Sequence, residues 1–258
     1  MPREARSIRV EAIVLKHSDF GEADRMLTLF TREKGKLKAI AKGARKTRSR
    51  KAGHVEPFSQ VSLQLAKGRN LYIVSQAEAI HTHAGLAEDL VRLGYASYIV
   101  ELLERFSVEE DENGALYSLL RDSLDRLEIR DQEQLAVRYY EIRLLDLLGF
   151  RPELHVCLNC EKEIKAEDQY FSSQMGGVLC PNCSPLDTSA QPISMGALKY
   201  LRHFQRSTYA DALKANMEAE IQFELETLMN HYLTYLLEKK LNSPQFLRRM
   251  RKEKMDKG

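Results

Sequence analysis

The sequence predicts an α+β protein in which a small N-terminal β-barrel precedes a helical domain that carries a cysteine-rich insert. Three observations lead to this fold class. Apolar and polar residues alternate with period two in the first eighty residues, which is typical of strands with one buried face. Helical periodicity replaces this pattern from Gly85 onward. All four cysteines then fall in a helix-poor segment at 151–192.

Five short strands are predicted in the first part of the chain. They lie at 8–14, 26–31, 36–42, 61–65 and 71–75. Gly, Asp and Asn residues between them are turn signals. Five strands within about eighty residues favour a small antiparallel barrel, and the OB-fold is the commonest five-stranded version. In the strand at 36–42, three lysines share the outward face with Ile40.

The helical domain is predicted to contain five helices. The first spans 86–106 and the second spans 116–127, and Asn113-Gly114 is the break between them. Asp131 with Gln134 resembles a capping box that opens a third helix, which stops at Gly149. Ser194 is predicted to cap the fourth, and the fifth runs over 217–241. We therefore predict an OB-fold domain at 1–80 and a helical domain at 81–258, with the insert at about 151–192.

The net charge of +2 conceals an asymmetry along the chain. Residues 1–80 have a net charge of +9, whereas residues 81–240 have −11. This imbalance predicts that an anionic partner binds the N-terminal third of the chain. No apolar run approaches the roughly 18 residues of a membrane-spanning helix, and Arg9 and Glu11 interrupt the segment where a signal peptide would have its apolar core. We expect a cytoplasmic protein that does not associate with a membrane.

The cysteines form two CxxC pairs separated by nineteen residues, and their positions are Cys157, Cys160, Cys180 and Cys183. Two pairs at this spacing are typical of a zinc ribbon or knuckle, in which each turn directs two sulfurs at one ion. Four thiolate ligands leave no open position for a catalytic water, so we expect one structural Zn²⁺. Two metal-free dithiols, or disulfides in an exported chain, are the alternatives.

The segment 42–51 contains six basic residues in ten and no acidic residue. It follows directly on the lysine-bearing strand, so strand and loop are predicted to form one positive surface that contacts nucleic-acid phosphates. The alternative is a solvated basic loop or a protease-sensitive linker. The predicted contact residues are Lys36, Lys38, Lys42, Arg45, Lys46, Arg48, Arg50 and Lys51.

Nothing in the sequence has the pattern of a catalytic site. There is no Walker A, GxGxxG, GxSxG or HExxH motif. His81 and His83 are two residues apart, but no neighbouring carboxylate or cysteine cluster is evident, and such a pair is usually polar surface. We therefore expect that the protein is not an enzyme.

Several short motifs, taken in order, closely resemble the RecO family of bacterial DNA repair proteins. The resemblance covers nearly the whole chain, and it rests on Gly21–Arg25, Phe30–Gly35, Ala41–Arg45, Pro57-Phe58, Leu147–Pro152, both CxxC pairs and Lys239–Phe246.

This resemblance implies a non-enzymatic recombination mediator located at the nucleoid. Proteins similar to this bind single- and double-stranded DNA and anneal complementary strands. They also associate with RecR and help RecA to replace SSB on single-stranded DNA. Some members lack a complete cysteine set, whereas this chain keeps all four.

The resemblance further implies that the helical domain receives the C-terminal tail of SSB, which ends in acidic residues and an aromatic residue. Such a tail requires an apolar notch rimmed by cations. The end of the last predicted helix offers both kinds of residue, at Tyr232, Leu236, Lys239, Lys240 and Phe246. The alternative is that the apolar members of this set belong to the core, because helical spacing alone does not separate a groove from a core.

A second class of function is an OB-fold and zinc-ribbon protein that binds RNA, or an enzyme acting on nucleic acid. The absence of a catalytic motif disfavours the enzyme. The residues alone do not separate DNA from RNA, because an OB surface binds either one through stacking and phosphate contacts.

Overall fold

The computed structural model describes residues 7–69 and 71–255. The chain packs into two compact units. Unit 1 contains the chain up to Ile129 together with the segment from Ser243 onward, and unit 2 spans Arg130–Asn242. Within the described residues, no helix is long and apolar enough to cross a membrane. The domain boundary near residue 80, which separates barrel from helices, stays a prediction.

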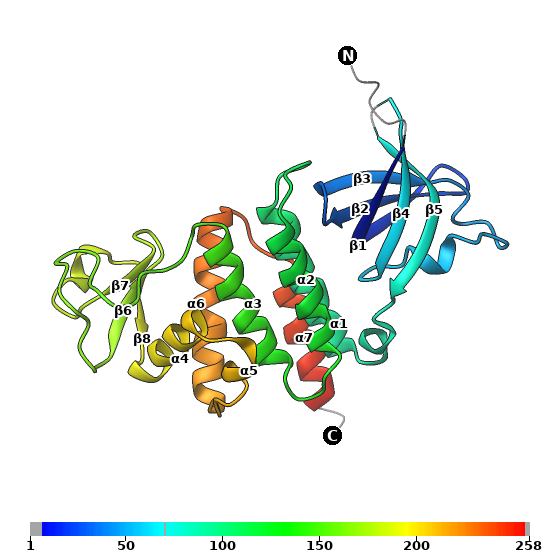
Figure 1. Cartoon of the computed structure of the whole chain (residues 1–258). Coiled ribbons are helices and arrows are strands. Elements are labelled where there is room, and N and C mark those ends of the chain that lie inside the picture. The colour runs from blue at the N-terminus through cyan, green and yellow to red at the C-terminus, as the bar shows by residue number, and fades with distance from the viewer. Residues whose placement is uncertain (1–6, 70, 256–258) are drawn as a thin grey trace, which may run out of the picture. The chain divides into compact units, whose positions relative to one another are not determined.

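Unit 1 begins with a closed five-stranded barrel (Figure 1). Its strands are β1 (Ser7–Phe20), β2 (Asp24–Thr31), β3 (Gly35–Ala41), β4 (Gln60–Lys67) and β5 (Tyr72–His81). Their order is β1-β2-β3-β5-β4, and the barrel closes through a short parallel contact between β3 and β5. This is the strand order of an OB-fold. All five predicted strands are confirmed, although β1 and β5 extend further than the sequence pattern indicated.

The barrel core is built from the alternating apolar residues of all five strands. Val10, Ala12 and Val14 of β1 are buried against Leu63 and Leu65 of β4 and other inward residues. On β3 the lysines point away from this core, as the period-two pattern predicted.

Two helices of unit 1 follow the barrel, after a short 3₁₀ turn at Ala84–Glu88. Asp89 caps α1 (Leu90–Phe106) by accepting hydrogen bonds from the backbone of Val91 and Arg92. Asn113 caps α2 (Gly114–Leu127) in the same way. Asn113, which was predicted to lie at the break between the first two helices, therefore caps the second of them.

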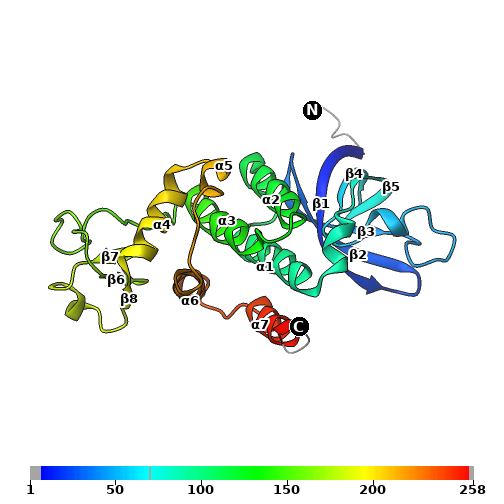
Figure 2. The ribbon, with the colours of Figure 1, turned by 90° about the horizontal axis from the view of Figure 1, so that it is seen from below.

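Helix α7 (Ser243–Met255) was not predicted, because the C-terminal segment has too many charges for a wide apolar stripe. It begins where Ser243 donates from both its backbone N–H and its hydroxyl to Glu101 of α1. Leu247 packs on Gly94 of α1, where a Cβ would lie 2.7 Å from its side chain. Figure 2 shows α7 beside α1.

Unit 2 contains a helical group and a small sheet. The helices are α3 (Glu133–Leu147), α4 (Met195–Arg206), α5 (Tyr209–Ala212) and α6 (Ala219–Leu237). The sheet has the order β7-β6-β8 and consists of β6 (Gln169–Ser172), β7 (Gly177–Leu179) and β8 (Gln191–Ile193). This sheet and its flanking turns form the predicted insert.

Two predicted helix starts in unit 2 have different outcomes. Ser194 caps α4 and accepts a hydrogen bond from the backbone of Ala197, as predicted. The capping box at Asp131 is wrong. Asp131 has a φ of +64°, and α3 begins after Gln132, which makes no side-chain cap hydrogen bond. Gly149, with a φ of +80°, follows α3 as the helix-stop pattern predicted.

Candidate nucleic-acid interface and metal centre

The basic loop 42–51 connects β3 to a 3₁₀ turn at Ala52–His54. Four of its cations are exposed and have no side-chain partner among residues 7–69 and 71–255, namely Lys42, Lys46, Arg48 and Arg50. Arg45 is also exposed, but its guanidinium contacts Asp19 at 3.0 Å. Asp24 fixes the start of the loop, since its Oδ1 accepts the Gly43 N–H at 2.7 Å. The loop thus presents uncompensated positive charge from an anchored base.

The lysines on β3 are engaged within the protein. Lys36 Nζ donates to the carbonyl oxygen of Glu104 at 2.7 Å and to that of Ser107, and burial lowers the pKa of Lys36. Lys38 pairs with Glu109 at 2.7 Å, and the hydrogen bond that its ammonium donates to this carboxylate raises the pKa of Lys38. The segment between α1 and α2 thus covers this face. The expected continuity of strand and loop as one positive surface is therefore not met at β3.

Lys51, at the end of the loop, also turns inward. Its Nζ donates to the carbonyl oxygen of Val74 on β5 at 2.7 Å. Of the eight predicted contact residues, four are free within the described residues to meet an anion without breaking an internal contact, and Arg45 can do so only in competition with Asp19 and with the carbonyl oxygens of Gly21 and Glu22.

A second group of cations on the barrel was not predicted. Lys67 ends β4 and Arg69 lies in the turn before β5, and both line a cavity of about 320 Å³ with Tyr72, Lys38 and the acidic residues Glu109 and Glu110. The signal in the sequence was the Lys67-Gly-Arg69 turn, which was interpreted only as a connection between strands. An aromatic side chain beside cations is the combination on which single-stranded nucleic acid stacks.

The four cysteines converge in the insert of unit 2. Their Sγ atoms all lie within 4.8 Å of one another, and those of Cys160 and Cys180 are 3.9 Å apart. Each CxxC pair is held in a turn: the Glu161 N–H donates to the carbonyl oxygen of Cys157, and the Cys183 N–H donates to that of Cys180. The four cysteines lie together in a cluster that could hold a metal ion.

The electrostatics of this cluster favour one thiolate. Burial opposes ionisation of Cys157, but N–H donors from Cys160, Cys180 and Asn159 outweigh it and lower the pKa of the thiol to about 6. At Cys183 the Asn159 amide favours the thiolate, yet the neighbouring thiols and burial outweigh it and raise the pKa to about 12. Four sulfurs this close repel one another when ionised, and a cation among them removes that repulsion.

The predicted partner-binding residues do not form one site within either unit. Tyr232, on α6 of unit 2, is 2% exposed, packs edge-on against Phe171 and donates its hydroxyl to the carbonyl oxygen of Phe150. It belongs to the core, which was the alternative left open by helical spacing. Leu236 is half-buried, and Lys239 and Lys240 are exposed just beyond α6. Phe246 lies on α7 of unit 1 and is 37% exposed.

The expectation that no carboxylate adjoins His81 and His83 is wrong. His81 Nε2 lies 2.9 Å from Glu128 Oε2, and His83 Nε2 lies 2.8 Å from Asp125 Oδ1. The His83 side chain is fully buried, with Nδ1 3.0 Å from the carbonyl oxygen of Phe58. Both carboxylates come from the end of α2, more than forty residues away in the sequence. His83 thereby ties the barrel to α2.

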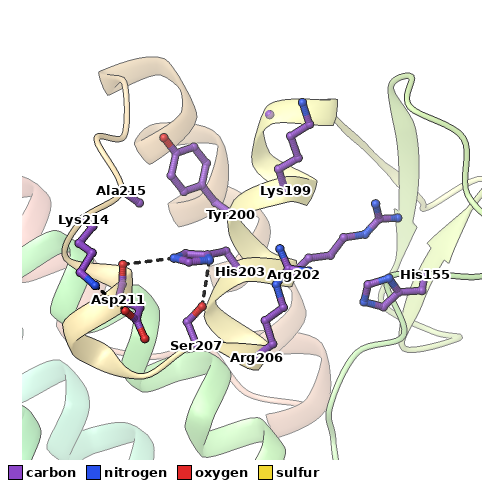
Figure 3. Close-up of a pocket in the computed structure, with 11 residues that line it drawn as sticks. His155, Lys199, Tyr200, Arg202, His203, Arg206, Ser207, Asp211, Lys214 and Ala215 are labelled. Atoms are coloured by element: carbon purple, nitrogen blue, oxygen red, sulfur yellow. Dashed lines mark hydrogen bonds and ion pairs between the residues drawn. The ribbon is translucent and has the colours of Figure 1, made fainter.

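A larger cavity of about 1070 Å³ lies on unit 2 beside α4 and α5 (Figure 3). Its charged lining is mostly basic, with Lys199, Arg202 and Arg206 from α4 and Lys214 from beyond α5. Figure 3 shows Arg202 extending toward His155 and the ring of His203 held between Ser207 and Asp211. Sequence reasoning missed this cavity because the net charge of the whole segment is negative.

Comparisons with known proteins agree across the chain. The model of the family described as "Recombination protein O N terminal" matches residues 5–83, and that described as "Recombination protein O C terminal" matches residues 87–245. A "DNA repair protein RecO" of Roseiflexus sp. (strain RS-1) is 40% identical over 94% of this chain and 85% of its own. Proteins of the same description from Pelotomaculum thermopropionicum and Desulforamulus reducens are 38% and 35% identical. These two alignments cover 93% and 97% of both chains, respectively.

Proposed function

This chain belongs to the RecO family of DNA repair proteins, and on that premise we propose that it is a non-enzymatic mediator that binds DNA through the loop 42–51 of its barrel. The observation that carries the proposal is the set of exposed cations on this loop that lack a side-chain partner in the described part of the chain. Phosphate contacts of this kind bind nucleic acid with little regard to sequence, which suits a protein that acts wherever single strands appear.

The loop is suited to following a flexible backbone. Gly43, Thr47 and Ser49 alternate with the cations, and short turn hydrogen bonds such as Ser49 N–H to Lys46 C=O hold its outer part. Lys67, Arg69 and Tyr72 form a separate group on the barrel that adds further cations and a ring for base stacking. Both single and double strands offer the phosphates that such a surface needs.

The four cysteines fit one structural Zn²⁺. A tetrahedral ion with Zn–S bonds of about 2.3 Å separates its sulfurs by about 3.8 Å, and Cys160 and Cys180 are 3.9 Å apart. Bound zinc would neutralise the thiolates and fix the two turns and the sheet that packs on them. Four cysteine ligands leave no position for a catalytic water, which supports a structural role.

The proposed partners follow from the family rather than from any contact in the structure. We propose that the protein acts with RecR, and that it receives the acidic tail of SSB and thereby helps RecA onto SSB-coated single strands. Exposed Lys239 and Lys240 at the end of α6 keep their predicted role in tail binding, together with half-buried Leu236.

The DNA surface is tested by reversing two loop charges, Lys46→Glu and Arg48→Glu. The matched control is Arg32→Glu with Lys34→Glu, two exposed cations in the turn between β2 and β3 that also lack a side-chain partner among the described residues. Affinity for a labelled twenty-nucleotide oligo(dT) is measured over a range of salt concentrations. The loop variant should bind weakly, and its slope of log K against log salt should flatten by about 1.4, or about 0.7 per lost contact.

The control pair should retain nearly all of the wild-type slope. Equal losses in both pairs would show a diffuse charge effect instead of a site. A competing RNA oligonucleotide of the same length separates the alternative function: preference for RNA would contradict a DNA repair mediator.

A further inference from the structure

Unit 2 has more acidic than basic residues, yet it gathers basic side chains around one cavity. Between Arg130 and Asn242 there are twelve Lys and Arg against sixteen Asp and Glu. Four of these twelve line the cavity of about 1070 Å³ beside α4, whereas Asp211 is its only acidic lining residue. His155 and His203 also line it.

Two of the cavity cations have no internal role that the structure shows. Lys199 and Arg206 are exposed and make no side-chain hydrogen bond or ion pair to the residues described. The other two are held in place: Lys214 pairs with Asp211 at 2.7 Å, and Arg202 donates twice to the carbonyl oxygen of Leu154. Arg206, in the last turn of α4, also offsets the helix dipole, but Lys199 in the first half of α4 does not.

The α4 cations form a row. Lys199, Arg202 and Arg206 are spaced i, i+3 and i+7, which places them along one face of the helix over about 10 Å at 1.5 Å per residue. A row of this kind matches successive charges on a linear polyanion. It is less suited to a single small anion, for which the donors would converge on one point.

The lining argues against an apolar peptide anchor. None of the residues that line this cavity in the described structure is Leu, Ile, Val, Met or Phe. Tyr200 is the only aromatic carbocycle, and its hydroxyl donates to the carbonyl oxygen of Asn216. A peptide tail with a terminal aromatic residue needs an apolar notch, whereas a sugar-phosphate backbone with an exposed base needs cations and one ring.

We propose that this cavity is a second nucleic-acid site, which holds the phosphate backbone of a single strand. The inference rests on the proposed function, because annealing requires the protein to hold two strands and the loop 42–51 accounts for one. The ligand is a single-stranded oligonucleotide, recognised through its phosphates by Lys199, Arg202 and Arg206 and through one base on Tyr200.

The test compares two double variants of unit 2. The cavity variant carries Lys199→Glu and Arg206→Glu, and the matched control carries Lys162→Glu and Lys165→Glu. Both pairs are exposed, and both change the net charge equally. A strand containing 5-bromouracil is crosslinked to each protein, and the crosslinked peptides are mapped. The annealing rate of two complementary forty-nucleotide strands is measured in parallel. Because charge reversal can disturb α4, Lys199→Gln with Arg206→Gln is a second variant, and circular dichroism checks that each protein is folded.

Wild-type protein and the control pair should crosslink at Tyr200 and anneal at the same rate. Both cavity variants should lose the Tyr200 crosslink and should no longer accelerate annealing above the rate without protein. They should keep their crosslinks at the barrel loop. A cavity variant that keeps the Tyr200 crosslink and anneals normally would overturn the proposal. So would variants that anneal normally but no longer bind a short aspartate-rich peptide ending in phenylalanine, since this result would assign the cavity to a protein tail. If wild-type protein formed no crosslink at the loop 42–51, this result would instead contradict the proposed function.

Discussion

Lys36 on β3 donates its ammonium group to the backbone carbonyl oxygen of Glu104 at the end of α1, at 2.7 Å. The same ammonium reaches the carbonyl oxygen of Ser107, so one lysine satisfies two acceptors where α1 ends. A cation that looks in the sequence like part of a phosphate-binding stripe therefore fastens the helix to the barrel.

Replacing Lys36 by Met should destabilise unit 1 and leave DNA binding nearly unchanged. Charge-assisted hydrogen bonds to two carbonyl groups contribute about 1–2 kcal/mol when half exposed. Urea denaturation measures the free energy of unfolding, and oligo(dT) affinity is measured on the folded variant. Lys42→Met is the matched control, because this exposed lysine makes no side-chain contact with the residues that the structure describes. It should keep full stability and lose affinity, and the reverse pattern would contradict the assignment of both residues.

Gly35 should not tolerate a side chain. Its φ is +62°, and a Cβ would lie 1.8 Å from the carbonyl oxygen of Asp111 in the segment between α1 and α2. We expect Gly35→Ala to cost more than about 2 kcal/mol, since a left-handed alanine alone costs about 1–2 kcal/mol and the backbone contact must also open. Gly21→Ala, at a φ of +58° with open space around it, isolates the strain alone. Equal losses in urea denaturation would show that the contact with Asp111 does not matter.

The carboxylate of Glu56 should make stability depend on pH. Burial opposes its ionisation, but hydrogen bonds from Arg25 at 2.7 Å and His17 at 3.2 Å outweigh it and lower the pKa below 4.5. A lowered folded-state pKa gives stability that is complete above the unfolded value and is lost as the pH falls through the folded value. Wild-type protein should therefore exceed Glu56→Gln in stability at pH 7, and the difference should shrink below about pH 4.5. A stability difference between wild type and Glu56→Gln that stays constant down to pH 3 would contradict the pairing of Glu56 with Arg25 and His17.

Removing zinc should unfold the insert and spare the barrel. Metal analysis should give about one equivalent of zinc per chain. The four thiols should react with a thiol reagent only after a chelator is added, because zinc-bound thiolates are protected. Cys183→Ala should lose the metal and the protection of β6 and β7 from hydrogen exchange, whereas Asn182→Ala, an exposed neighbour, should keep both. Rapid reaction of all four thiols in the untreated protein would contradict a metal centre.

Local patterns predicted the parts of this molecule that depend on local physics. Alternation placed five strands because each barrel strand buries one face, and the CxxC turns brought four sulfurs together because each turn is closed by its own backbone hydrogen bonds. The Ser194 cap followed from one side chain and one nearby N–H. The local pattern was enough to predict each of these features, although the two CxxC pairs meet through contacts such as Cys180 N–H to Cys157 Sγ.

Tertiary contacts decided the rest. The outward face of β3 was correctly assigned, but no local pattern shows that the segment between α1 and α2 covers it. Tyr232 has the spacing of a groove residue, and only the position of Phe171 shows that it is core. The i, i+3, i+7 row at Lys199, Arg202 and Arg206 was present in the sequence, but it was obscured by averaging charge over a long acidic segment.

The central claim, that the loop 42–51 captures DNA for a repair mediator, is tested most directly by RecA loading. The measurement is the lag before RecA hydrolyses ATP on circular single-stranded DNA coated with SSB, in the presence of RecR. Wild-type protein and the Arg32→Glu, Lys34→Glu control should shorten the lag, whereas the Lys46→Glu, Arg48→Glu variant should leave it as long as with no added protein. A loop variant that shortens the lag as well as wild type would contradict the account.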